Sequence, residues 1–191
     1  MADKIKIFSI IWMLLSTLFN PLKAAENFVT VTTVRQDQYI LISASFELPL
    51  SQCDAYRYLT DNSNQHALSG VVYSNTKRIS INKVQIDRRV EEEVLFIPIH
   101  LDSLIEVTEL PFKGTDFVQI SGSAKSYKGS WRLEPKGDNT LFVFSGITDP
   151  GTMMPGFLVE HYINKNLRRN FEEIAKLGLN RKDSIVEACK I

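Results

Sequence analysis

The residue with the clearest potential for chemistry is Arg88, which stands in a run that alternates between apolar and polar residues. The alternation places its side chain on the same strand face as Val84, Ile86 and Val90. An unpaired charge is costly to bury, so an inward-facing arginine needs a partner such as the headgroup or carboxylate of a ligand. The alternative is a β-bulge, which would direct Arg88 to solvent, and the same two alternatives apply to Glu92 further along the strand. The acidic run Glu91–Glu93 that follows is typical of a solvated strand end.

The remaining titratable residues form no recognised catalytic or metal-binding motif. His66, His100 and His161 are not spaced as metal ligands, and Cys53 and Cys189 form no C-x-x-C pair. The glycine patterns of phosphate-binding loops and of nucleophile elbows are also missing from the sequence. We therefore expect no metal ion and no cofactor, and we assign no catalytic residue.

One segment near the C-terminus, 155–177, repeats at the period of an amphipathic helix. Its apolar residues recur three or four positions apart: Leu158, Val159, Tyr162, Ile163, Leu167, Phe171 and Ile174. Pro155 suits the first turn of this helix, and Gly178 is expected to end it. A single helix of this kind is marginal in water, so its apolar stripe needs a partner surface.

The preceding residues are predicted to supply that surface as a sheet. The expected strands span 29–35, 39–48, 71–79, 84–94, 97–110, 117–121, 129–134 and 140–147. A short helix capped by Ser51 separates the second strand from the third. Short gaps between the later strands favour antiparallel pairing, because parallel pairs need long crossovers. The order of elements predicts an α+β fold in which a curved antiparallel sheet holds the long helix.

The composition permits one domain and argues against nucleic acid as a partner. The chain has 191 residues with 22 basic and 22 acidic side chains, so it offers no basic field.

Residues 1–24 have the layout of a secretory signal peptide, with Lys4 and Lys6 before the apolar run 7–19. The alternative for this segment is an uncleaved anchor. We expect an exported protein, periplasmic if the source is bacterial and otherwise secreted, with a domain at 26–180 and a tail at 181–191.

Export bears on the two cysteines. An oxidising compartment allows Cys53 and Cys189 to form a disulfide, but two independent thiols are an equal alternative because Cys189 lies in the expected tail.

Four short stretches resemble the START-like, or SRPBCC, helix-grip superfamily. They are 59–61 (LTD), 129–135 (GSWRLEP), 139–141 (NTL) and the prolines Pro150 and Pro155 before the long helix. The superfamily includes lipid-transfer START domains, polyketide cyclase/dehydrase-type proteins, Bet v 1 proteins and coenzyme-Q-binding proteins. The resemblance covers roughly 29–177, mainly through the order of elements. The expected export departs from the many intracellular members of that group.

The resemblance implies a cavity between the sheet and the long helix. Inward positions of the predicted strands and helix are the ligand-binding candidates: Ile42, Ala44, Ile86, Arg88, Val90, Ile99, Leu101, Ile105, Val107, Trp131, Leu133, Leu158 and Tyr162. Alternatively, these side chains simply fill a core.

We expect an exported carrier that holds a hydrophobic small molecule, such as a lipid or quinone, without altering it. A carrier of this kind would contact membranes transiently. One alternative is an enzyme of the cyclase/dehydratase type that uses the same cavity, and another is a partner-binding domain with a filled core. The sequence does not give the oligomeric state.

Overall fold

The computed structural model describes residues 29–62, 68–151, 155–186 and 189. The predicted signal segment 1–24 and His66 lie outside these residues. None of the helices within the described ranges is long and apolar enough to span a membrane.

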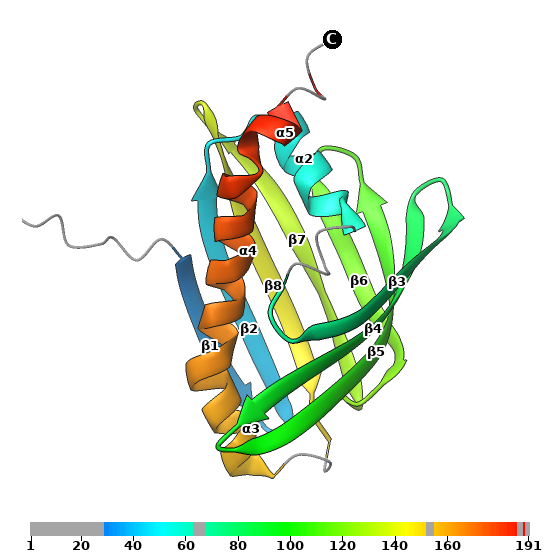
Figure 1. Cartoon of the computed structure of the whole chain (residues 1–191), viewed down its shortest axis with the longest axis vertical. Coiled ribbons are helices and arrows are strands. Elements are labelled where there is room, and N and C mark those ends of the chain that lie inside the picture. The colour runs from blue at the N-terminus through cyan, green and yellow to red at the C-terminus, as the bar shows by residue number, and fades with distance from the viewer. Residues whose placement is uncertain (1–28, 63–67, 152–154, 187–188, 190–191) are drawn as a thin grey trace, which may run out of the picture.

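Eight strands form one curved antiparallel sheet (Figure 1). The strands are β1 (Val29–Gln36), β2 (Tyr39–Leu48), β3 (Val71–Ser80), β4 (Lys83–Val94), β5 (Ile97–Leu110), β6 (Gly114–Gly122), β7 (Ser126–Lys136) and β8 (Asn139–Asp149). Their order in the sheet is β1-β2-β8-β7-β6-β5-β4-β3. The first hairpin thus pairs with the last strand, and the rest follow as a meander. All eight predicted strands are confirmed, and most extend by a few residues beyond their predicted ends.

A long helix crosses the concave side of the sheet (Figure 1). It comprises α3 (Gly156–His161), a π-helical segment η2 (Tyr162–Leu167) and α4 (Arg168–Asn180). The predicted long helix is therefore confirmed, although its π-helical segment was not foreseen. Two shorter helices, α2 (Gln52–Thr60) and α5 (Lys182–Val186), lie together at one end of the molecule. The predicted α+β helix-grip architecture is confirmed.

The prediction that Gly178 ends the long helix is wrong. Gly178 is buried within α4, which continues to Asn180. A Cβ atom on Gly178 would lie 2.5 Å from Leu48 Cδ1 and 3.1 Å from the ring of Tyr58. The residue therefore lets α4 approach α2 and β2 closely.

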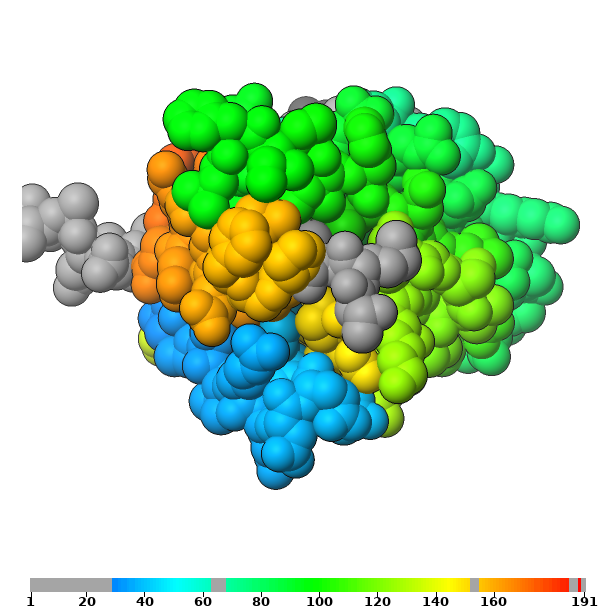
Figure 2. Space-filling model, turned by 90° about the horizontal axis from the view of Figure 1, so that it is seen from below, coloured from blue at the N-terminus to red at the C-terminus, as the bar shows by residue number. Residues whose placement is uncertain are grey.

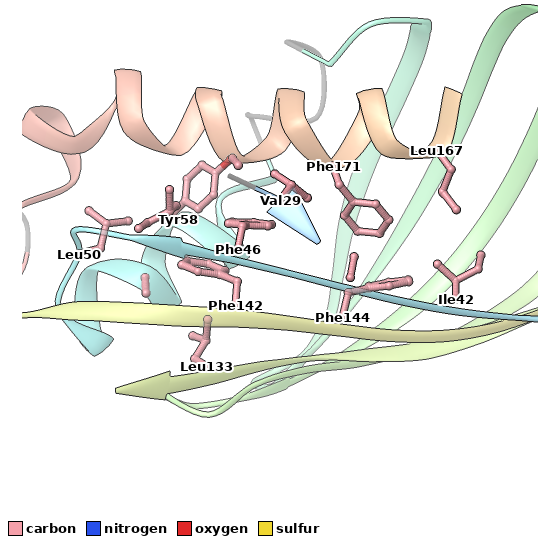
Figure 3. Close-up of a cluster of buried hydrophobic side chains, with 14 of the residues drawn as sticks. Val29, Ile42, Phe46, Leu50, Tyr58, Leu133, Phe142, Phe144, Leu167 and Phe171 are labelled. Carbon is pink, nitrogen blue, oxygen red and sulfur yellow. The ribbon is translucent and has the colours of Figure 1, made fainter. Parts of the chain in front are cut away.

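An aromatic core joins the long helix to the central strands (Figure 3). Phe46 of β2 stacks on Phe142 of β8, with ring centroids 5.0 Å apart. Phe144 of β8 contacts Phe171 of α4 at 5.1 Å. Tyr58 of α2 donates a hydrogen bond to a backbone carbonyl of α4. This part of the sheet is packed directly against the helix.

A disulfide links Cys53 of α2 to Cys189, which follows α5, with Cα atoms 6.2 Å apart. Of the two alternatives for the cysteines, the structure contains the bonded one. The predicted tail, 181–191, therefore includes a short helix and a covalent attachment to the body of the domain.

Candidate functional site

Two cavities lie inside the curve of the sheet. The main cavity has a volume of about 340 Å³ and lies between the long helix and strands β2, β4, β5, β7 and β8. A second cavity of about 150 Å³ lies between the end of α2 and strands β4, β5 and β6. Arg88, Tyr127, Trp131 and Phe144 line both cavities. The two spaces are therefore adjacent and share a wall of one charged and three aromatic side chains.

Most of the candidate residues predicted from the sequence line these cavities. Those in the wall of the main cavity are Ile42, Arg88, Val90, Leu101, Trp131 and Tyr162. Ile86, Ile105 and Val107 line the smaller one. The other four do not line either cavity: Ala44, Leu133 and Leu158 are buried in packed regions, and Ile99 is a partly exposed residue opposite Glu92.

Several wall residues were missed at the sequence level. Tyr127 precedes Trp131 at even spacing on β7, and Phe144 alternates with Phe142 on β8. Strand alternation was thus a usable signal for both. Phe171 and Asn170 of α4 also line the main cavity. Asn170 carried no such signal, because it stands among charged residues on the helix.

Arg88 points into the cavities, and the interpretation that a β-bulge turns it to solvent is wrong. The pairing of β4 with β5 is unbroken from Lys83 to Val94, and the bulges in this part of the sheet lie on β3. Val84 and Ile86, which share the face of Arg88, are buried. The Arg88 Nε atom is buried and has no hydrogen-bond partner within the described part of the chain. An unpaired donor is thus available in a wall that is mostly aliphatic or aromatic.

The interpretation of the whole acidic run Glu91–Glu93 as a solvated strand end is wrong for Glu92. Glu91 and Glu93 are exposed, but Glu92 is only 8% exposed and faces the long helix. Its Oε2 atom accepts hydrogen bonds from Asn166 Nδ2 at 3.1 Å and Arg169 Nη2 at 2.8 Å. The pairing offsets the cost of burying the carboxylate. Glu92 therefore ties β4 to the helix beside the main cavity.

Two tyrosines bring hydroxyl groups to the same region. Burial raises the pKa of Tyr162 to about 12, and the nearby Glu92 carboxylate acts in the same direction. Burial also raises the pKa of Tyr127, against the opposing effect of the Arg88 charge. Both phenols therefore remain protonated at neutral pH. They can donate hydrogen bonds, and they are poorly suited to act as bases.

The π-helical segment positions part of this polar group. Such segments are rare and are frequently found at functional sites. Here η2 carries Tyr162, which lines the main cavity, and Asn166, which binds Glu92. Asn170, one turn further, donates to the Tyr162 hydroxyl at 3.3 Å, and its Oδ1 atom has no partner among the described residues. The wider turn thus places three polar side chains between the helix and β4.

The arrangement favours binding of an apolar molecule with one polar group. Arg88 Nε and the tyrosine hydroxyls offer donors, whereas most of the surrounding wall is aliphatic or aromatic. Within the described ranges, no three His, Cys, Asp or Glu side chains are grouped so that they could hold a metal ion.

The comparisons with known proteins rest on structure. No family model matches the chain, and no curated protein is similar to it in sequence. Several solved structures share its fold. TTHA0849 from Thermus thermophilus superposes with a TM-score of 0.64 and 17% identity over 78% of this chain and 99% of its own.

Two further similar structures carry descriptive names. A STAR-related lipid transfer protein from Xanthomonas axonopodis gives a TM-score of 0.63 with 14% identity, covering 78% of this chain and 90% of its own. The Zhui aromatase/cyclase from Streptomyces sp. R1128 gives 0.60 with 11% identity, covering 80% of this chain and 98% of its own. The chain therefore has the helix-grip fold of START-type proteins.

Proposed function

We propose that this protein is an exported carrier that holds a hydrophobic small molecule between its sheet and its long helix, without chemical change to the molecule. The observation that carries the proposal is the main cavity of about 340 Å³ with its mostly apolar wall. Ligand pockets commonly have volumes of about 300–1,000 Å³. The volume therefore suits a single-chain amphiphile or a compact ring system better than a lipid with two long chains.

Arg88 is the proposed anchor for the polar end of the cargo. Its Nε atom lacks a partner within the described residues, and an unpaired donor of a charged group is costly to bury. A carboxylate or another oxygen acceptor on the ligand would remove that cost. The hydroxyl groups of Tyr127 and Tyr162 are available to the same acceptor. We infer that the cargo has one oxygen-bearing end and an apolar body.

Two further observations support parts of this proposal. A lipid transfer protein is among the structures that share the fold, although similarity at 14% identity supports only the architecture. The disulfide between Cys53 and Cys189 is of the kind that persists in oxidising compartments, which supports export.

The proposal is tested by identifying what the purified protein contains. Native mass spectrometry and solvent extraction should detect a bound apolar molecule. Val90→Trp should abolish the signal, because the larger side chain fills the cavity, whereas Val118→Trp on the exposed outer side of β6 should not. An empty wild-type protein that also fails to take up a fluorescent fatty acid would refute the carrier function.

The anchor has its own matched pair of variants. Arg88→Met removes the donor from the cavity, whereas Arg89→Met removes a neighbouring surface arginine that pairs with Asp102. We expect Arg88→Met to weaken binding of a fatty acid at least tenfold and to leave binding of the matching hydrocarbon unchanged. Equal effects of the two variants on fatty-acid binding would exclude Arg88 as the anchor.

A second candidate is an enzyme of the cyclase/dehydratase type. The observation that favours it is the pair of partly buried tyrosines beside Arg88, Tyr127 and Tyr162, which could donate protons to a polyketide-like substrate. Tyr162→Phe separates the candidates. It should abolish turnover of a poly-β-ketone substrate by an enzyme, but it should change the affinity of a carrier by less than about tenfold.

A further inference from the structure

Four large apolar side chains are exposed at one end of the molecule. Leu95 and Phe96 form the turn between β4 and β5, Ile97 is the first residue of β5, and Phe157 lies on the first turn of α3. Phe96 is 91% exposed. Figure 2 shows the β4–β5 end directly beside α3 on this face. We call these four residues the apolar tip.

The backbone of the turn is unfavourable for the residues that it carries. Leu95 and Phe96 have φ angles of 52° and 65°, and Val94 pairs with Ile97 across the turn. A two-residue hairpin loop of this kind is normally occupied by Asn and Gly, which tolerate positive φ. Leucine and phenylalanine are strained there, and among the described residues the two side chains remain 44% and 91% exposed. Backbone strain together with solvent-exposed apolar groups points to a function outside the folded domain.

The apolar tip is the outer end of the elements that wall the main cavity. Val90 of β4 and Leu101 of β5 line the cavity and lie five residues from Leu95 and Phe96. Tyr162 lies five residues after Phe157 on the long helix. The cavity wall also includes residues of the β6–β7 turn, at the same end of the sheet. A surface that contacts the apolar tip would therefore lie close to the cavity.

We propose that the apolar tip inserts into the surface of a lipid bilayer while cargo is exchanged. The proposal rests on the proposed function, because a bilayer is where an apolar cargo dissolves. The exposed carboxylates beside the tip are Glu91 and Glu93 of β4 and Glu160 of α3, and they outnumber their basic partners, since Arg35 lies 3.8 Å from Glu160 and His100 lies 3.2 Å from Glu91. Anionic lipids attract proteins through basic residues. Because carboxylates predominate beside the tip, the proposed bilayer is one of neutral lipid and not of anionic lipid. Aromatic and aliphatic side chains at the level of the headgroups supply the binding energy.

The test uses the full chain with phosphatidylcholine vesicles and two matched probes. Ile81 is 93% exposed in the β3–β4 turn, at the other end of these strands, and is the control for Phe96. Phe96→Trp should show strong quenching by brominated lipid above the wild-type signal, and Ile81→Trp should not. Addition of anionic lipid should not increase the quenching. Similar quenching of the two probes, or none at position 96, would overturn the proposal.

A second variant separates membrane binding from folding. Leu95→Asn/Phe96→Gly gives the turn residues that suit its backbone, so the variant should unfold at a higher temperature than the wild type. Its partition onto vesicles should fall at least tenfold, whereas Ile81→Ser should partition like the wild type. Unchanged partition of the turn variant would overturn the proposal. The proposal would also be overturned if the two substitutions removed a copurifying protein and left lipid binding unchanged.

Failure of this proposal is distinct from failure of the carrier function. Extraction of the turn variant measures its cargo independently of vesicles. If cargo is extracted from the protein but Phe96→Trp is not quenched by lipid, the insertion proposal alone is refuted. If Phe96→Trp is quenched but no cargo is ever found, the carrier function alone is refuted.

Discussion

The long helix packs closely against one part of the sheet and is separated from another part by a cavity. At the end of the molecule near α2, the helix is packed closely against the sheet: Ala175 is buried in the hydrophobic core, and Gly178 contacts Leu48 and Tyr58. On the side of β4 and β5, the sheet curves away, and the space between holds the main cavity. We call these the closed half and the open half.

The polar atoms follow the same division. Three of the four buried side-chain atoms without a partner, within the described ranges, belong to Arg88, Glu92 and Asn170, which lie at the open half. The fourth belongs to Asp54 on α2. Unsatisfied polar groups destabilise a fold, so their concentration beside one cavity indicates that this half is shaped for binding. The closed half supplies the stability that the open half lacks.

The largest expected effect contrasts a side chain from each half. Phe142→Ala should lower the free energy of unfolding by about 3–5 kcal/mol, because Phe142 is fully buried in the aromatic core. Val90→Ala should cost less than about 1 kcal/mol, because Val90 already borders an empty space. Urea unfolding of both variants measures the difference. Equal losses would mean that the open half is packed as tightly as the closed half.

A pH experiment probes the open half alone. The pKa of Tyr162 is about 12 in the folded protein and about 10 in the unfolded chain. The unfolded state therefore loses its proton first, and the stability that Tyr162 contributes is complete below pH 10 and is lost as the pH rises towards 12. The loss should amount to about 2 kcal/mol.

Tyr162→Phe should remove this part of the pH dependence. The melting temperatures of the wild type and the variant, compared between pH 9 and pH 12, measure it as a change in their difference. A difference that stays constant across this range would show that Tyr162 is solvated and that the open half admits water freely.

Alanine substitutions at two glycines of the long helix test the packing of its two ends with the smallest change in side-chain volume. Gly178→Ala should destabilise the protein by about 1–3 kcal/mol, because the new methyl group would collide with Leu48 and Tyr58. Gly156→Ala should be neutral or stabilising by up to about 1 kcal/mol, because its Cβ would meet no atom within 4 Å. Thermal unfolding checks both. A harmless alanine at position 178 would mean that α4 and α2 are less tightly packed than described.

Sequence patterns were sufficient to predict the architecture and some of the residues that line the main cavity. Period-two alternation identified the inward side of β4 and β5, and so placed Val90 and Leu101 correctly. The same reasoning could not separate wall from core, because Ala44 and Leu133 also face inward but lie in the closed half. Alternation records which side of a strand a residue occupies. The distance to the opposite layer depends on the curvature of the whole sheet.

Two other features could be decided only from tertiary contacts. Strand alternation put Glu92 on the face of Arg88 but left its burial open, because that burial depends on Asn166 and Arg169, which are more than seventy residues away in sequence. Gly178 has the composition of a helix stop, and only its contact with Leu48 and Tyr58 shows its different role. Interactions of this kind are set by tertiary packing and not by the neighbours along the chain.

The bond between Cys53 and Cys189 joins residues that are 136 positions apart in sequence, and the ring that it closes includes β3 to β8 and the long helix. A protease that cuts one peptide bond within that ring would leave two fragments still covalently joined. Such a nicked molecule would migrate as one band on a non-reducing gel and as two bands after reduction. A single cut in a loop of that ring would therefore not release any strand that lines the cavity.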